Sequence, residues 1–210
     1  MEELGRRERK KLRTREALID AAFKQFAERG FEATTVEEIA DEVDVSSRTF
    51  FRYFSSKEDV VLTFHEEQFS RVVEALCGRP PEEPVITALR HAIVNVAEAY
   101  ERGEGGIDTS RMQCVLEMSS QSPSVLARSL EHAQKKQSTL TRILAERMGV
   151  DPDDDLRPHV AATMATCAFQ STAELWTKRP DRFPTLSSAV DEALALIESG
   201  VNFPAHPKTP

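Results

Sequence analysis

The chain has 210 residues, of which 40% are hydrophobic and 30% are charged, a composition that is ordinary for a globular protein. Its formal net charge of −8 argues against a protein that coats nucleic acid regardless of sequence, although local positive charge still permits DNA binding. No apolar run reaches the ~18 residues of a membrane span and no signal-peptide pattern occurs, so we expect a soluble, cytoplasmic protein with no membrane partner.

The N-terminus is rich in basic residues. They are Arg6, Arg7, Arg9, Lys10, Lys11, Arg13 and Arg15. We predict a flexible basic arm over residues 1–13 that turns this end of the molecule toward a polyanion. The alternative is a solvated tail that only aids solubility.

The first predicted helix spans residues 14–29. Its apolar residues recur at helical spacing, at Leu18, Ala21, Ala22 and Phe26. We expect the helix to stop at Gly30, because glycine easily adopts the positive φ that ends many helices.

A second, short helix is predicted over residues 36–43. Thr35 and Glu38 have the spacing of a capping box, in which a hydroxyl and a carboxylate satisfy free backbone amides at a helix start. We expect Asp44 in the turn that follows, because aspartate tolerates left-handed backbone angles better than most residues.

A third helix is predicted over residues 47–54, after two serines that can cap it. At about 100° per residue, Arg48 and Arg52 point to one side and Phe50 and Phe54 to the other. Two short helices joined by a tight turn form a helix-turn-helix, in which such arginines read guanine edges or grip phosphate. The alternative is an ordinary solvated helix face.

A fourth helix is expected over residues 57–77. It can be capped by Ser55 with Glu58 or by Ser56 with Asp59. Because it would run from the helix-turn-helix into the rest of the chain, we expect it to transmit a ligand-induced movement to the helix-turn-helix.

These residues carry a family resemblance. The stretches TVEEIA from Thr35, VS from Val45 and RTFFRYFSSKE from Arg48 resemble the DNA-binding domain of the TetR family of regulators. The likeness covers about residues 14–62. It implies an all-α protein with an N-terminal three-helix helix-turn-helix DNA-binding domain and a C-terminal helical ligand-binding and dimerisation domain.

The resemblance also implies roles for single residues. Those that would contact phosphates are Thr35, Tyr53 and Lys57. Those that would face or approach base edges are Ser47, Arg48, Thr49 and Arg52, and Ser46 and Phe51 complete the predicted DNA-binding set. Phe51 stands where the family usually has a phosphate-binding tyrosine, so its ring would touch a sugar or a thymine methyl. Asp44 replaces a common turn glycine and brings a negative charge near DNA.

The rest of the chain is predicted to be helical. The expected helices cover residues 84–102, 108–119, 123–148, 156–178 and 186–198. As the resemblance implies, the last two would pair with their two-fold mates in a homodimer; the alternative is packing within one subunit only. The expected domains are an arm at 1–13, a DNA-binding domain at 14–60, an effector-binding and dimerisation domain at 61–198 and a flexible tail at 199–210.

An effector cavity is predicted in the second domain. Its candidate lining residues are Phe64, Val72, Ile93, Tyr100, Met112, Leu116, Met118, Met164, Phe169 and Trp176. The predominance of apolar candidates favours a lipophilic small-molecule effector; the alternative is that these residues are ordinary core.

No catalytic or metal-binding motif is present in the sequence. The five histidines are dispersed, and no glycine-rich phosphate loop or Gly-x-Ser-x-Gly motif occurs. The three cysteines are far apart and suggest neither a zinc site nor a disulfide framework. We therefore expect no enzyme activity, no metal and no cofactor.

Taken together, the sequence predicts a homodimeric transcription regulator that binds double-stranded DNA. Its simplest form is a repressor that a small lipophilic ligand releases from a palindromic operator. One alternative is a DNA-binding protein without an effector. The other is an all-helical ligand-binding or interaction protein without operator-specific DNA binding, against which Arg48, Arg52 and Tyr53 argue.

Overall fold

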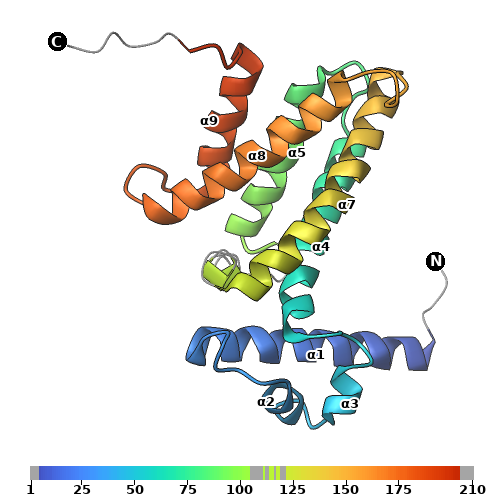
Figure 1. The fold of residues 1–210 in the computed structure, drawn as a ribbon, viewed down its shortest axis with the longest axis vertical. Coiled ribbons are helices and arrows are strands. Elements are labelled where there is room, and N and C mark those ends of the chain that lie inside the picture. The colour runs from blue at the N-terminus through green and yellow to red at the C-terminus, as the bar shows by residue number, and fades with distance from the viewer. Residues whose placement is uncertain (1–4, 105–110, 112–113, 116, 119–121, 204–210) are drawn as a thin grey trace. The chain divides into compact units, whose positions relative to one another are not determined.

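The computed structural model describes residues 5–104, 111, 114–115, 117–118 and 122–203. Within these residues the elements are all helices (Figure 1): α1 (Arg6–Arg29), α2 (Val36–Asp41), α3 (Ser47–Phe50), α4 (Lys57–Cys77), α5 (Val85–Glu101), α7 (Pro123–Met148), α8 (Arg157–Lys178) and α9 (Leu186–Ser199). The described residues of the helix expected at 108–119 are helical as well. The all-α prediction is confirmed. None of the helices described is both long and apolar enough to span a bilayer.

Most helix boundaries agree with the prediction to within two residues, and α7 has the predicted bounds. The first helix differs, because it begins at Arg6 and residues 6–13 continue it. The expectation of a flexible arm over residues 1–13 is therefore wrong from Arg6 onward. Residues 6–13 are arginine, lysine, glutamate and leucine, all of them good helix formers, so nothing in the segment stops the helix from extending toward the N-terminus.

The chain divides into two compact units. The first comprises Met1–Gln68 and Asp108–Gln134, and the second comprises Phe69–Ile107 and Lys135–Pro210. The N-terminal parts of α4 and α7 thus belong to the same unit as α1, α2 and α3, whereas the expected boundary lay near residue 60. Ser199, expected to begin the tail, is the last residue of α9.

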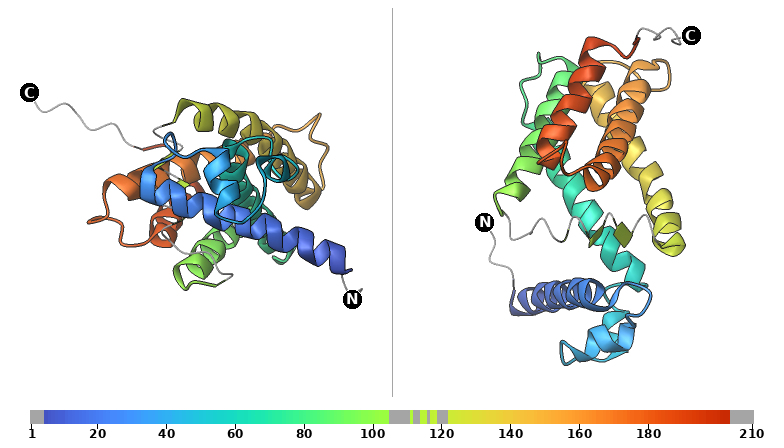
Figure 2. Two further views of the ribbon diagram at one scale, coloured as in Figure 1. Left: turned by 90° about the horizontal axis from the view of Figure 1, so that it is seen from below. Right: turned by 90° about the vertical axis from the view of Figure 1, so that its left-hand side faces the viewer.

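The first unit is held together by the apolar face of α1. Leu18 and Ala22 are fully buried, and Ile39 of α2 and Phe50 of α3 are fully buried with them. Figures 1 and 2 show α2 and α3 on the same side of α1. Burial of a side chain such as Phe50 stabilises the fold by about 1.5–3 kcal/mol. The packing of α2 and α3 on α1 is therefore stabilised by these buried apolar side chains.

The core of the second unit lies among α5, α8 and α9. Helix α9 packs against both α5 and α8 (Figure 2). Most of the buried residues of α8 are small, among them Ala161, Ala162 and Ala165, and small side chains let helices approach closely. Beside this core, Arg90 of α5 forms ion pairs with Asp191 at 2.7 Å and with Glu198 at 2.6 Å.

Candidate DNA-binding surface

The helix-turn-helix predicted from sequence is formed by α2, α3 and the turn between them. The capping box is complete: Thr35 N donates to Glu38 Oε2 at 2.9 Å, and Glu38 N donates to Thr35 Oγ1 at 3.2 Å. Asp44 has a φ of 53°, as expected for the turn, and Val45 N donates to the Ala40 carbonyl at 3.0 Å. These local bonds set the direction in which the chain enters α3.

Helix α3 begins as predicted but ends earlier. Ser46 is its N-cap, with Oγ accepting from Thr49 N at 3.3 Å. The helix was expected to reach residue 54, but it ends at Phe50. The amides of Arg52 and Tyr53 donate to carbonyls three residues back, at 3.2 and 2.8 Å, and this tightens the chain into a turn.

Burial separates two faces of residues 47–54, as predicted. Phe50 is fully buried and Phe54 is 5% exposed, whereas Arg48 and Arg52 are exposed. Phe51 is 54% exposed, and its ring meets that of Phe50 edge-on, with the centroids 5.6 Å apart. The two buried rings therefore anchor a segment whose arginines are exposed to solvent.

Arg52 and Tyr53 form a stacked pair at the end of this segment. The Arg52 guanidinium carbon lies 5.2 Å from the centroid of the Tyr53 ring, and Arg52 Nη2 donates to the Tyr53 hydroxyl at 3.3 Å. Stacking on an aromatic face limits the conformations of a guanidinium, which otherwise loses entropy on binding. Ser47 and Thr49 are half-buried beside the exposed arginines.

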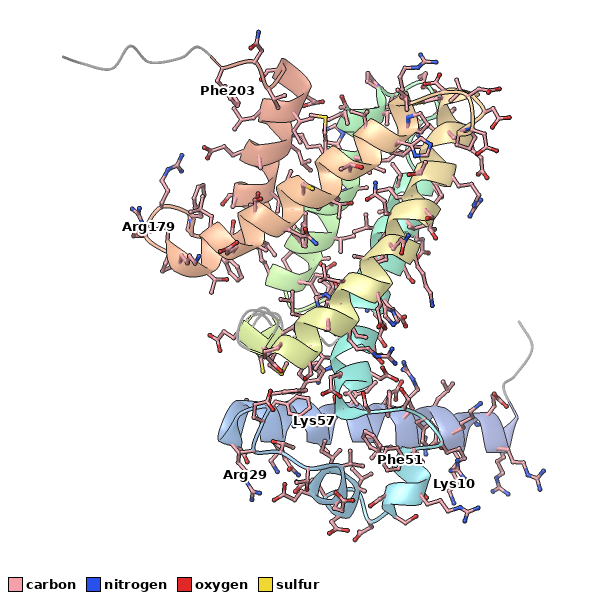
Figure 3. All side chains as sticks on the ribbon, viewed as in Figure 1. Lys10, Arg29, Phe51, Lys57, Arg179 and Phe203 are labelled. Carbon is pink, nitrogen blue, oxygen red and sulfur yellow. The ribbon has the colours of Figure 1, made fainter. Side chains whose placement is uncertain are left out.

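The basic residues of α1 belong to the same unit as this surface. Every side chain from Arg6 to Arg13 is exposed on the helix, and Figure 3 labels Lys10 among them. Farther along α1, the Arg15 guanidinium carbon lies 5.6 Å from the centroid of the Phe54 ring. The positive charge expected on a flexible arm is thus carried by a helix that also contacts the end of residues 47–54, the recognition segment.

Lys57, predicted to contact phosphate, is bound within the protein. Its Nζ donates to the carbonyl oxygens of Phe31 at 2.7 Å, Thr34 at 3.1 Å and Glu32 at 3.5 Å. The ammonium joins the first residue of α4 to the loop between α1 and α2 (Figure 3). Sequence reasoning missed this role, because the three acceptors are backbone atoms 23 to 26 residues away.

Thr35, the other predicted phosphate contact at a helix start, is exposed but engaged. Its hydroxyl donates to Glu38 Oε2 at 3.0 Å in addition to capping α2. Hydrogen bonds from the Thr35 backbone and hydroxyl hold the pKa of Glu38 below its usual value. A phosphate at this position would therefore compete with the Glu38 carboxylate for the Thr35 hydroxyl.

The predicted effector-lining residues are divided between the two units. Met112 and Leu116 lie outside the described residues, and Phe64 and Met118 are buried in the first unit. In the second unit, Ile93, Tyr100 and Trp176 are buried and Val72, Met164 and Phe169 are half-buried. The effector cavity remains a prediction.

The first unit contains a hollow of about 530 Å³ beside the end of α1. Phe26, Arg29, Phe31, Cys114 and Met118 are among its lining residues, so among the described members of the predicted set it shares Met118 alone. Burial raises the pKa of the Cys114 thiol. Within the described part of the chain, no cluster of His, Cys, Asp and Glu is arranged to hold a metal ion.

Models of known protein families match two separate parts of the chain. Residues 18–63 match the family model described as bacterial regulatory proteins, tetR family, and residues 83–202 match the model described as MftR C-terminal domain. The HTH-type transcriptional regulator TcmR of Streptomyces glaucescens is 36% identical over 192 residues, which cover 90% of this chain and 85% of that protein.

Solved structures show the same fold. Thermus thermophilus FadR, a TetR-family transcriptional repressor in complex with lauroyl-CoA, aligns with a TM-score of 0.58 and 25% identity, covering 93% of this chain and 98% of that one. The fatty acid degradation regulator FadR from Bacillus halodurans aligns with a TM-score of 0.60 and 19% identity over 97% of this chain and 100% of that one. The relatives are transcription regulators, in agreement with the expectation that this chain is not an enzyme.

Proposed function

The chain belongs to the TetR family of bacterial regulatory proteins, and we propose that it is a homodimeric repressor that a small lipophilic ligand releases from a palindromic operator. Binding to DNA as a transcription regulator follows from the family. The palindromic operator, the homodimer and the lipophilic ligand are proposed here in addition. We also propose that the protein acts in the cytoplasm.

The observation that carries the proposal is the contrast between the two faces of residues 47–54. Arg48 and Arg52 are exposed four positions apart, while Phe50 between them is fully buried. Such a segment can lie in the major groove, where arginine bonds guanine N7 and O6 in pairs. The exposed cations of α1 then supply attraction to phosphates, which binds DNA without reading its sequence.

Exposed apolar side chains support a homodimer through α8 and α9. Val160 and Leu175 of α8 are 52% and 46% exposed, and Leu196 of α9 is 45% exposed. A dimer that covers these side chains would remove apolar area from water, about 25 cal/mol for each Å² buried. Two recognition segments related by a two-fold axis require half-sites about one turn of DNA apart, ~34 Å, and hence a palindromic operator.

The structure of FadR with lauroyl-CoA supports a lipophilic effector, since that protein has the same fold and is 25% identical to this chain. An acyl-CoA is therefore the first effector class that we propose. A ligand releases the operator only to the extent that it binds the DNA-free conformation more tightly than the DNA-bound one.

The proposal is tested by selecting fragments of the source genome that the purified protein binds, and by titrating lauroyl-CoA into the complex with the most enriched fragment. We expect an inverted repeat, two protein chains per repeat and release by the ligand. Enrichment of an operator that lauroyl-CoA does not release would support operator binding and contradict lauroyl-CoA as the effector. No enrichment over random DNA would contradict the proposal.

A further inference from the structure

Arg128, in the second turn of α7, contacts the segment that joins α3 to α4. Its Nη2 donates to Asp59 Oδ1 at 3.1 Å and to Ser55 Oγ at 3.4 Å. Ser55 directly follows Phe54, the buried end of the recognition segment, and Asp59 lies in the first turn of α4. One guanidinium thus connects α7 with the turn that follows the arginines proposed to read DNA.

Asp59 is the centre of this contact. Its Oδ2 accepts from Ser55 N at 3.0 Å and also from the Ser55 hydroxyl. Burial opposes ionisation of this carboxyl, but hydrogen bonds from Ser55 and the guanidinium of Arg128 together hold its pKa below the usual value. The carboxylate is charged near neutral pH. It binds the backbone amide of Ser55 through one oxygen and Arg128 of α7 through the other.

Two serines at the start of α7 repeat this connection. Ser124 Oγ donates to Glu58 Oε1 at 2.9 Å, and Ser122 Oγ donates to Glu32 Oε1 at 2.6 Å. Glu58 is the neighbour of Asp59 in the first turn of α4, and Glu32 lies in the loop after α1. The start of α7 therefore meets both ends of the segment that contains α2 and α3.

The ion pair between Arg128 and Asp59 contributes too little energy to be explained as a stabilising element. An ion pair whose partners are 39% and 23% exposed, as Arg128 and Asp59 are, contributes about 0–1 kcal/mol to folding. Hydrogen bonds, in contrast, weaken steeply once their length or angle departs from the preferred geometry. The contact is therefore better suited to fix a position than to add stability.

We propose that Arg128 is a positioning residue for operator recognition: through Asp59 and Ser55 it fixes the turn after α3, and so the direction in which Arg48 and Arg52 face DNA. The inference rests on the proposed function, in which those arginines read bases. In this proposal α7, like α4, determines the orientation of the recognition segment. Arg128 itself does not touch DNA.

The test compares Arg128→Gln with Arg142→Gln, a matched change on the same helix. Arg142 is 62% exposed and pairs with Glu146 one turn away. For each protein, affinity is measured for the selected operator and for a scrambled duplex of equal length, at several salt concentrations. The ratio of the two affinities is the readout, because a loss of folded protein lowers both affinities equally and leaves the ratio unchanged.

We expect Arg128→Gln to lower this ratio about tenfold or more, the effect of weakening one bidentate base contact, with unchanged salt dependence. Arg142→Gln should leave the ratio unchanged, and Arg128→Lys, which keeps a charged donor, should restore part of it. Adding Asp59→Asn to Arg128→Gln should cost less than the two separate losses combined, because both remove the same contact.

Two results would overturn the inference while leaving the proposed function intact. One is an operator preference that Arg128→Gln and Arg142→Gln affect equally. The other is an equal loss on both duplexes with a flatter salt dependence, which would make Arg128 a phosphate contact. If the unchanged protein itself does not prefer the operator, the proposed function fails and this inference fails with it.

Discussion

The ammonium of Lys57 lies 2.7 Å from the carbonyl oxygen of Phe31 and 4.3 Å from the centroid of the Phe31 ring. With two further carbonyl oxygens within 3.5 Å, the charge at the start of α4 is directed at the loop after α1. A phosphate contact by the same ammonium, as the family resemblance implies, would compete with these bonds. Lys57 thus links the start of α4 to the loop between α1 and α2 within the DNA-binding domain.

Replacing Lys57 should therefore destabilise the protein. We expect Lys57→Met to lower the free energy of unfolding by about 1.5–3 kcal/mol, the usual contribution of hydrogen bonds to a charged group, as measured by urea denaturation. Lys11→Met, at an exposed position of α1, is the matched control and should change stability little. Unchanged stability of Lys57→Met, together with weaker DNA binding and a flatter salt dependence, would instead identify a phosphate contact.

Phe50 and Phe51 are adjacent in the chain and should respond oppositely to truncation. Phe50 is fully buried, so Phe50→Ala should cost about 3–5 kcal/mol of stability in urea denaturation. Phe51 is 54% exposed, so Phe51→Ala should leave stability nearly unchanged and weaken operator binding through the lost ring contact. Equal losses of stability in the two variants would show that the burial of this segment is described incorrectly.

Arg48→Ala should alter the sequence that the protein prefers. Loss of a bidentate contact to guanine costs about 1–3 kcal/mol of discrimination at the base pair concerned. We expect a panel of operators with single base-pair changes to show that loss at one or two positions only. A uniform fall in affinity over the whole panel would mean that Arg48 binds phosphate and does not read bases.

The loop before α5 should contribute stability that depends on pH. Arg79 donates to both carboxylate oxygens of Glu83, at 2.6 and 2.7 Å, and with help from His91 lowers the pKa of Glu83 from 4.5 to about 2. Because the folded-state pKa is the lower one, this stabilisation is complete above pH 4.5 and is lost as the pH falls toward about 2.

Glu83→Gln measures that contribution. Its stability should fall below that of the unchanged protein at pH 6, and the difference should shrink as the pH is lowered from 4.5. Glu82→Gln, at the exposed neighbouring position, is the control and should show no such pH dependence. A difference that stays constant across this range would rule out the ion pair as its source.

The proposed dimer predicts that a charge on α8 disrupts assembly. Leu175→Arg should convert the dimer to monomers in sedimentation experiments, because a charge would be placed where apolar side chains are covered. Leu130→Arg on α7, where Leu130 is 62% exposed, is the matched change and should leave the dimer intact. Dissociation by the α7 variant alone would move the interface from α8 to α7.

Features whose partners lie close in sequence were predictable. The capping box of Thr35 and Glu38 and the positive φ of Asp44 depend on residues within one or two turns, and both were anticipated. The N-terminal part of α1 was not predictable from charge, because the many charges of residues 6–13 indicate a solvated arm whereas their helix propensity favours a helix. The end of α3 at Phe50 was not predictable, because a continuous pattern of side chains does not show where the backbone tightens.

Features whose partners lie far away were not predictable. Arg128 and Asp59 are separated by 69 positions, and an arginine on a helix surface gives no sign of such a partner. The carbonyl acceptors of Lys57 leave no trace in the sequence, because any residue supplies a carbonyl. Buried residues of α4, α5 and α8 were recognised as apolar, but apolar character alone does not separate ordinary core from the wall of a cavity.

The most direct test of the central claim is competition binding of the purified protein between the selected inverted repeat and a scrambled duplex of the same length, at physiological salt. We predict that the repeat is preferred by about 10³-fold or more, as specific regulators prefer their operators. We also predict that Arg48→Ala removes much of that preference. Equal affinity for the two duplexes would contradict operator recognition by α3.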